Sequence, residues 1–228
     1  MLNYAISFAA ALLCAGMAYL AMTKCLADKI KIFNILGSGE DHESRDVKKA
    51  EKAAAVIAAA ALSFAASYRL LTCEATTDTV VRVLLLFLPI TAAGCIDSRE
   101  KRIPNIISLF LFVEGIVFLG LEFFINRDLF ESYAVSCLLS FGATFIVLAL
   151  VGLVTGKGIG AGDIKLLSTL GLVGGVYLLC GTVVVATVVC AVVALTLLVT
   201  KKKSLKSSLP YGPFIAVGFF VTVIFNLY

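Results

Sequence analysis

Residues 156–165 read Gly-Lys-Gly-Ile-Gly-Ala-Gly-Asp-Ile-Lys, and this stretch separates two apolar runs. One run covers residues 145–155, and the next begins at Ile164. Glycine permits close backbone approaches that a Cβ would prevent. The pattern predicts that Asp163 stands where a hydrophobic helix begins. An acid at the end of a membrane helix is costly to bury and indicates a function, although a helix-capping Asp in a cytoplasmic turn would give the same pattern.

The composition is that of an all-α polytopic membrane protein. The 228 residues are 61% hydrophobic with a mean hydropathy of +1.03, whereas soluble domains are about 45–50% apolar. The net charge of +4 is typical of basic cytoplasmic loops in such proteins, so no nucleic-acid partner is expected. The seven cysteines form no CxxC pair, and we expect neither a metal site nor another cofactor.

Eight apolar segments approach the roughly 20 residues that a transmembrane helix requires. The sixth and seventh run almost together, and the only polar break expected between them is at Gly181 and Thr182. Gly171 and Gly175 form a small-xxx-small pair, which predicts tight packing of the sixth helix. The eight predicted spans are 3–23, 52–71, 80–97, 105–125, 132–154, 164–180, 181–200 and 211–227.

The basic residues predict the orientation of these eight spans. Alternating loops carry sixteen Lys and Arg residues on one side and three on the other. Because the positive side is cytoplasmic, both termini are expected outside. The cytoplasmic loop 24–51 is the only long polar segment, and His42 within it is expected to be solvated. The cluster at 201–203 is expected to contact anionic membrane lipid.

A second aspartate is predicted at the same membrane level as Asp163. Asp97 ends the third span, and a basic turn leads to Pro104 and Asn105 at the start of the fourth. Two neighbouring carboxylates share one proton near neutral pH. The ionised carboxylate can then activate water while the protonated one polarises a peptide carbonyl. The alternative is that each aspartate only caps a helix or pairs with nearby basic residues.

Three motifs carry a family resemblance over roughly residues 80–228. Residues 97–105 read Asp-Ser-Arg-Glu-Lys-Arg-Ile-Pro-Asn, residues 158–165 read Gly-Ile-Gly-Ala-Gly-Asp-Ile-Lys, and residues 209–214 read Leu-Pro-Tyr-Gly-Pro-Phe. In order and spacing they resemble the type IV prepilin peptidases, a family of GxGD membrane aspartyl proteases. The resemblance implies that Asp97 and Asp163 are the catalytic pair of an aspartic endopeptidase.

The resemblance also implies a substrate and a location. The substrate would be a prepilin-like precursor with a short basic leader, a Gly before the cut and an apolar helix. The enzyme would lie in a prokaryotic cytoplasmic membrane and cut at the cytoplasmic face. Residues 80–228 would form a six-helix peptidase core, and residues 1–79 a two-helix region. Residues expected to support the pair are Gly160, Gly162, Lys165, Pro104 and Asn105.

One departure from the family concerns a second activity. Long bacterial members carry paired CxxC motifs in the loop after the first helix, and that loop is associated with N-methylation of the new pilin N-terminus. Here loop 24–51 contains only Cys25. We therefore expect a short member of the family without methyltransferase activity.

Two other functions fit part of the pattern. Another GxGD protease, of the presenilin or signal-peptide-peptidase kind, would have Tyr before the first aspartate, where this chain has Ile96. An ion-coupled transporter would place its acids near the midplane within a repeated architecture.

Glu114, near the middle of the fourth span, is expected to face the bundle in a structural role. The glycines do not indicate a nucleotide site, because no strand precedes them.

Overall fold

The computed structural model describes five helical regions of the chain. The residues described are 77–125, 127–155, 159–200 and 209–227, with helical positions 57, 61, 62, 64–69 and 72. The predicted first span, loop 24–51 with His42, most of span 52–71 and the lysine cluster 201–203 lie outside these residues.

The described part of the chain is helical, as the sequence predicts. Four of its helices are long and apolar enough to cross a membrane: Thr79–Glu100, Asn105–Phe124, Phe130–Val154 and Ala161–Val199. The complete helices are α3 (Thr77–Glu100), α4 (Asn105–Ile125), α5 (Arg127–Val154), α6 (Ala161–Val199) and the shorter α7 (Gly212–Phe225).

A sharp turn joins α3 to α4. The Lys101 N–H donates to the Asp97 carbonyl at 2.9 Å, and Lys101 adopts the left-handed conformation (φ 52°) that commonly ends a helix. Pro104 then disfavours helical geometry at the residue before it, and α4 begins at Asn105. The proline therefore shapes this junction, as predicted from its position before the fourth span.

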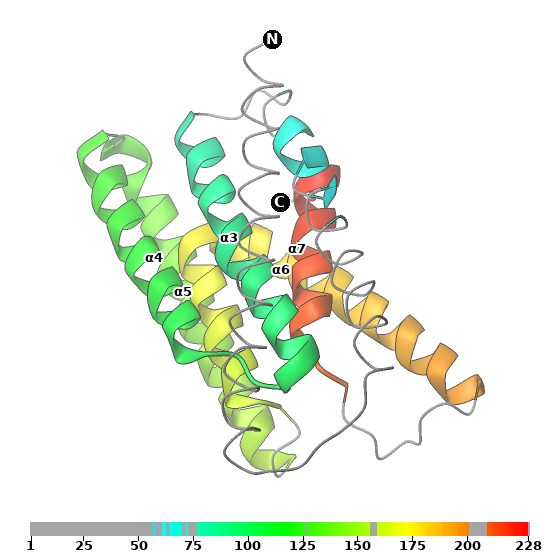
Figure 1. The fold of residues 1–228 in the computed structure, drawn as a ribbon. Helices are drawn as coiled ribbons and strands as arrows, with labels where there is room; N and C mark the ends of the chain where they lie inside the picture. The colour runs from blue at the N-terminus through cyan, green and yellow to red at the C-terminus, as the bar shows by residue number, and fades with distance from the viewer. Residues whose placement is uncertain are drawn as a thin grey trace, which may run out of the picture.

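The predicted break at Gly181 and Thr182 is wrong, and the chain bends at Gly175 instead. Gly175 has φ 73° and ψ −175° within α6, a conformation that glycine adopts far more readily than other residues. The bend gives α6 an N-terminal half (161–174) and a C-terminal half (176–199), which point in different directions (Figure 1). The bend thus lies six residues before the expected break, and α6 extends from Ala161 to Val199 on both sides of it.

Side chains of α5 bind the backbone groups around this bend. The Ser136 hydroxyl accepts the Val176 N–H at 3.1 Å, and the Tyr133 hydroxyl donates to the Val173 carbonyl at 3.0 Å. The Ser140 hydroxyl donates to the Gly171 carbonyl at 2.6 Å. A break in a membrane helix is tolerated when neighbouring groups satisfy the freed backbone, so α5 stabilises the bend.

The predicted tight packing at Gly171 and Gly175 is confirmed. A Cβ on Gly171 would lie 2.9 Å from the Ser140 Oγ, and one on Gly175 would lie 3.0 Å from the Ser136 Oγ. Both glycines therefore allow α6 to approach the same face of α5.

The helices pack in antiparallel pairs that bring several helix ends together. The end of α3 meets the start of α7, with Asp97 beside Gly212, and aromatic contacts join Phe87 to Phe219 and Phe220 further along. The ends of α3, α5 and α6 and the starts of α4, α6 and α7 lie toward the lower end in Figure 1, and the end of α4 and the start of α5 lie at the upper end. The last turn of α3, with Asp97, and the first turn of α6, with Asp163, therefore lie at the same end of the bundle.

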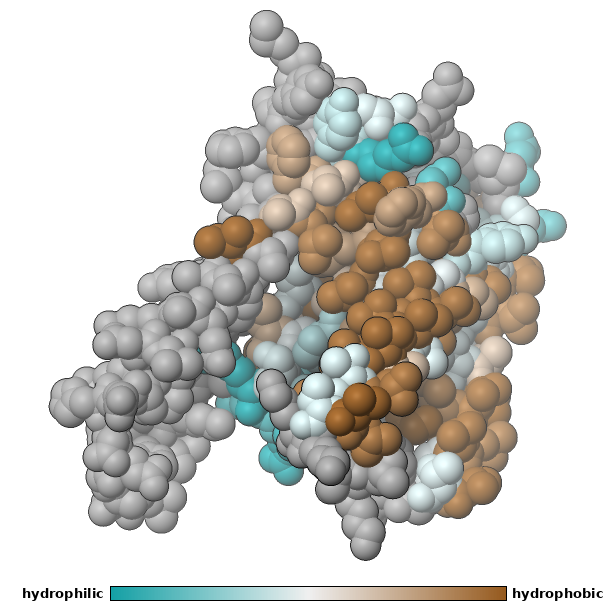
Figure 2. Space-filling view, turned by 90° about the vertical axis from the view of Figure 1, so that its right-hand side faces the viewer, coloured by the Kyte–Doolittle hydropathy of each residue, from teal (hydrophilic) through white to brown (hydrophobic). Residues whose placement is uncertain are grey.

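The outer surface of the bundle is apolar. Large exposed hydrophobic side chains include Phe110, Leu139, Val147, Leu150 and Val188. Figure 2 shows apolar side chains across the middle of one face, with hydrophilic ones toward the ends. Apolar residues on both the inside and the outside of the bundle are what a membrane protein requires.

Candidate active site

Asp97 lies in the last turn of α3 with its carboxylate held by the start of α7. The side chain is buried, at 5% exposure, and its Oδ2 accepts the Gly212 N–H at 2.8 Å. The first N–H groups of a helix have no partner within the helix, and they carry a partial positive charge. Burial disfavours the ionised form of the Asp97 carboxyl group, and this contact, across 115 residues of sequence, opposes that effect.

Gly212 leaves room for this contact. A Cβ at position 212 would lie 2.7 Å from the Asp97 Cβ and 2.9 Å from its Oδ2. Pro213 occupies the first turn of α7, where a missing N–H carries no cost. In the Tyr-Gly-Pro sequence at 211–213, Gly212 thus allows close approach to Asp97 and supplies the N–H donor, and Pro213 favours the start of the helix.

Asp163 lies in the first turn of α6, as predicted, and two glycines, Gly160 and Gly162, precede it. A Cβ on Gly160 would come within 2.9 Å of the Asp163 Oδ2, so Gly160 leaves room for the carboxyl group. A Cβ on Gly162 would lie 3.0 Å from the Ile103 Cβ. Gly162 therefore permits the approach of α6 to the α3–α4 turn, the role expected of it.

The structure brings Asp97 and Asp163 into one site. Burial is the larger effect on the Asp163 carboxyl group, and Asp97 lies near enough for its charge to add to that effect. Asp163 Oδ1 is buried and has no hydrogen-bond partner among the described residues. Two acids in this arrangement differ in their surroundings, since a backbone N–H stabilises only one of them. Such a pair holds one proton more readily than none, because two adjacent negative charges repel each other.

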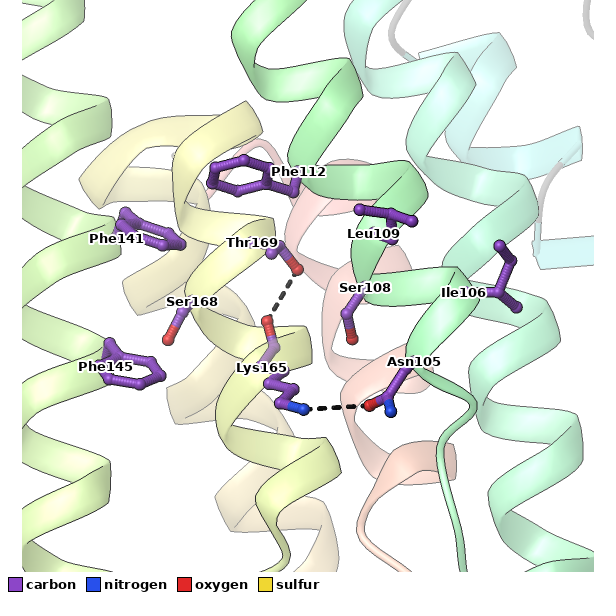
Figure 3. Close-up of a pocket in the computed structure, with 10 residues that line it drawn as sticks. All are labelled: Asn105, Ile106, Ser108, Leu109, Phe112, Phe141, Phe145, Lys165, Ser168 and Thr169. Atoms are coloured by element: carbon purple, nitrogen blue, oxygen red, sulfur yellow. Dashed lines mark hydrogen bonds between the residues drawn. The ribbon is translucent and has the colours of Figure 1, made fainter.

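Lys165 and Asn105 contact each other and not the aspartate pair. The Lys165 Nζ donates to the Asn105 Oδ1 at 3.1 Å, which links α6 to α4. Both residues line one end of an open pocket of about 590 Å³ between α4, α5 and α6, whose other walls include Leu109, Phe112 and Phe141 (Figure 3). The contact of Lys165 is thus with a side chain of α4 and not with the aspartate pair that it is expected to support.

Tyr211 and Thr187 form a contact between the start of α7 and α6 that the sequence does not predict. The two hydroxyl oxygens lie 3.1 Å apart. Tyr211 directly precedes Gly212, whose N–H donates to Asp97. The motif at 209–214 includes Tyr211 and Gly212 and so indicates that they matter. No sequence pattern in α6 distinguishes Thr187 from the other threonines of that helix.

Glu114 faces the bundle interior, as expected. It is 7% exposed and follows Leu111 along the buried face of α4. Neither carboxyl oxygen has a hydrogen-bond partner among the described residues. A buried acid without a partner is held in its neutral form, which is consistent with a structural role.

Comparisons with known proteins agree with the resemblance seen in the motifs. Residues 83–195 match the model of the type IV leader peptidase family. A prepilin leader peptidase/N-methyltransferase of Stutzerimonas stutzeri is 31% identical over 145 residues, covering 63% of this chain and 49% of that protein. The Pseudomonas aeruginosa protein of the same name is 30% identical over 145 residues, with the same coverage.

A protein of this name from Bacillus subtilis is 33% identical over 81 residues, covering 36% of this chain and 33% of that protein. The chain spans about half the length of the two relatives from Stutzerimonas and Pseudomonas. No solved structure matches the chain.

Proposed function

Because residues 83–195 match the model of the type IV leader peptidase family, we propose that this chain is a membrane aspartic endopeptidase. Its substrate is a prepilin-like precursor, and the bond cut is the one between the leader and the apolar helix. Asp97 and Asp163 are the catalytic residues. Residues 80–228 form the peptidase core, and residues 1–79 form a separate two-helix region.

The observation that carries this proposal is the convergence of the two aspartates. They come from α3 and α6, and their charges interact although 66 residues separate them in the sequence. Gly212, from a third helix, holds Asp97 in place. A paired-acid site needs two positioned carboxyl groups, and a water molecule activated by them attacks the peptide bond.

The proposed reaction needs only water and the shared proton. The ionised carboxylate removes a proton from water as the water oxygen bonds to the peptide carbonyl carbon. The protonated carboxyl group gives its proton to the carbonyl oxygen, which forms a tetrahedral diol. The first carboxyl group then protonates the leaving nitrogen, the C–N bond breaks, and the second carboxyl group regains a proton from a diol hydroxyl. The pair returns to its starting state.

The membrane orientation follows from charge. Sixteen of the nineteen basic residues fall on the side predicted to be cytoplasmic, and both aspartates lie at that end of their helices. A precursor whose leader stays in the cytoplasm would present its cleavage site at this level. We therefore place the active site at the cytoplasmic face of a prokaryotic inner membrane, with eight spans and both termini outside.

We propose that the chain does not transfer a methyl group. The relatives from Stutzerimonas and Pseudomonas carry N-methyltransferase in their names, but this sequence has no CxxC pair and a single cysteine in loop 24–51. Incubation with S-adenosylmethionine and a cleaved pilin peptide would test this. The expected product shows no added 14 Da by mass spectrometry, and a methylated N-terminus would contradict the proposal.

Peptide cleavage tests the proposed activity directly. The full chain, purified in detergent, is incubated with a peptide that has a basic leader, a Gly and an apolar helix, and the products are mapped by mass spectrometry. We expect one cut after the Gly, and no cut in a matched peptide in which Leu replaces that Gly. Intact substrate after incubation with folded protein would contradict the proposed function.

A further inference from the structure

We propose that the bend of α6 at Gly175 sets the separation of the two catalytic aspartates. Two side chains of α5, Tyr133 and Ser136, are positioning residues that fix the angle of this bend. The inference rests on the proposed function and extends it from the two acids to the part of the fold that holds them together. Its basis is the way in which the described helices divide at the bend, and two hydrogen bonds made there.

The N-terminal half of α6, which carries Asp163, packs with α4 and α5. A Cβ on Gly115 of α4 would lie 2.7 Å from the Leu172 Cγ, so this glycine lets the two helices come close. The Ser140 hydroxyl of α5 donates to the Gly171 carbonyl at 2.6 Å. We call α4, α5 and this half of α6 the Asp163 unit.

The C-terminal half of α6 packs against α7. A Cβ on Gly181 would lie 2.6 Å from the Thr222 Cγ2. Further along, the hydroxyl oxygens of Thr187 and Tyr211 lie 3.1 Å apart. This half of α6 is therefore joined to α7 both by close packing and by a hydrogen bond.

Helix α7 packs in turn against α3, which carries Asp97. A Cβ on Gly94 of α3 would lie 3.0 Å from the Ala216 Cβ. At the end of α3, the Gly212 N–H donates to the Asp97 carboxylate. We call α3, α7 and the C-terminal half of α6 the Asp97 unit.

The two aspartates thus belong to different units, and α6 passes from one unit to the other at Gly175 (Figure 1). Asp163 lies twelve residues before the bend, about 18 Å along a helix that rises about 1.5 Å per residue. A change of about 5° at the bend would therefore move Asp163 by about 1.6 Å. A displacement of about 1 Å in an active site can reduce the rate about a hundredfold. The α3–α4 turn also joins the units, but it is a short non-helical link, whereas α6 is helical on both sides of its bend.

Two hydrogen bonds from α5 occupy backbone groups that a continuous helix would pair across the bend. In such a helix the Val176 N–H would donate to the carbonyl four residues earlier, and the Val173 carbonyl would accept the N–H four residues later. Here the Val176 N–H donates to the Ser136 hydroxyl at 3.1 Å, and the Val173 carbonyl accepts the Tyr133 hydroxyl at 3.0 Å. Loss of either hydroxyl leaves that backbone group without this partner, and the helix can pair it again by straightening at Gly175.

The ring of Tyr133 is itself held by a side chain of the Asp97 unit. The Arg82 guanidinium of α3 lies 4.3 Å from the centre of the Tyr133 ring, an arrangement that attracts the cation to the ring face. The same guanidinium lies 3.9 Å from the Glu122 carboxylate of α4, and both charged side chains are buried. The hydroxyl that binds the bend therefore comes from a ring that contacts both units.

The first measurement is the cleavage of the leader peptide by variants of the full chain. Ser136→Ala removes the acceptor of the Val176 N–H, and Tyr133→Phe removes the hydroxyl but keeps the ring beneath Arg82. We expect kcat to fall by about ten- to a hundredfold in each, with KM little changed, because the reacting acids are displaced. Ser140→Ala is the matched control, because both ends of the bond that it loses lie within the Asp163 unit. It should keep the wild-type kcat.

The second measurement is the distance between the two units in the same proteins. Spin labels at the exposed positions Val147 of α5 and Val192 of α6 report this distance by electron paramagnetic resonance. The labels are carried on unnatural amino acids, because the exposed Cys180 would also react with a thiol label. We expect the distance to change in Ser136→Ala and Tyr133→Phe and to stay at the wild-type value in Ser140→Ala. A loss of stability alone would lower the Tm of all three variants without changing the distance.

The outcomes are distinct. A wild-type distance and a wild-type kcat in both Ser136→Ala and Tyr133→Phe would overturn the inference, and so would a changed distance with an unchanged kcat. An equal loss of kcat in Ser140→Ala would show that the bonds at the bend have no special role and would also overturn it. A wild-type protein that cleaves no leader peptide would overturn the proposed function, while the distances would still show whether the two hydroxyl groups fix the bend.

Discussion

The backbone N–H of Gly212 donates a 2.8 Å hydrogen bond to the Asp97 carboxylate, and a Cβ at position 212 would lie 2.7 Å from the Asp97 Cβ. This contact explains why a Gly-Pro pair begins the last helix. Pro213 starts α7, and the glycine lets the helix start come close enough to hold an acid of α3.

Substitution of Gly212 by Ala should displace Asp97. The added methyl group overlaps the Asp97 side chain, so the carboxylate must shift, and a 1 Å displacement in an active site can reduce the rate about a hundredfold. We expect kcat/KM for leader cleavage to fall by about that factor. Gly142→Ala is the matched control, because its Cβ would meet no atom within 4 Å. Equal activities of the two variants would contradict the role given to Gly212.

Substitution of Gly175 by Ala should destabilise the bend of α6. Its φ of 73° lies in the left-handed region, which costs an L-residue about 1–2 kcal/mol, and the new Cβ would lie 3.0 Å from the Ser136 Oγ. Thermal unfolding in detergent should show a lower Tm than that of wild type. Gly181→Ala is the comparison variant: its Cβ would also be crowded, by Thr222, but Gly181 has no positive φ, so the variant tests crowding without backbone strain. A Gly175→Ala protein with wild-type Tm would argue against the bend.

Substitution of Lys165 by Met should affect stability more than catalysis. It removes the hydrogen bond to Asn105, which links α6 to α4, and an exposed bond of this kind contributes about 1 kcal/mol or less. We expect a small decrease in Tm and a cleavage rate within about tenfold of wild type. Complete loss of cleavage with an unchanged Tm would show that Lys165 acts on the aspartate pair.

Substitution of Glu114 by Gln should be mild. The acid is buried without a described partner, and an amide of the same shape replaces its neutral form. We expect the free energy of unfolding to change by less than about 1 kcal/mol and cleavage to continue. Loss of all cleavage in a variant that unfolds at the wild-type temperature would place Glu114 in the catalytic mechanism.

The sequence predicted the helices where polar residues interrupt apolar runs. Pro104 and the basic turn before it placed α4 at 105–125, as observed. The start of α5 was set at residue 132, but the helix begins at Arg127, because polar residues continue a membrane helix beyond its apolar part. The alternating direction of successive predicted spans is enough to predict that both aspartates lie at one end of the bundle.

The bend of α6 and the hydroxyl contacts could not be predicted in the same way. The sequence favours Gly181 as the break between the sixth and seventh spans because a polar residue adjoins it. In the structure Gly181 is helical and packs against Thr222 of α7. Beside the bend, the Val176 N–H donates to the Ser136 hydroxyl of α5, which lies 40 residues away along the chain. The Thr187–Tyr211 contact likewise depends on packing between α6 and the start of α7.

The cleavage activity of Asp97→Asn and Asp163→Asn tests the central claim most directly. Each variant is assayed with the leader-bearing peptide, and thermal unfolding confirms that its fold is retained. Because the two acids act as one unit, each single variant should lose cleavage completely, and the double variant should be no less active than either. Wild-type cleavage by either folded single variant would contradict the account.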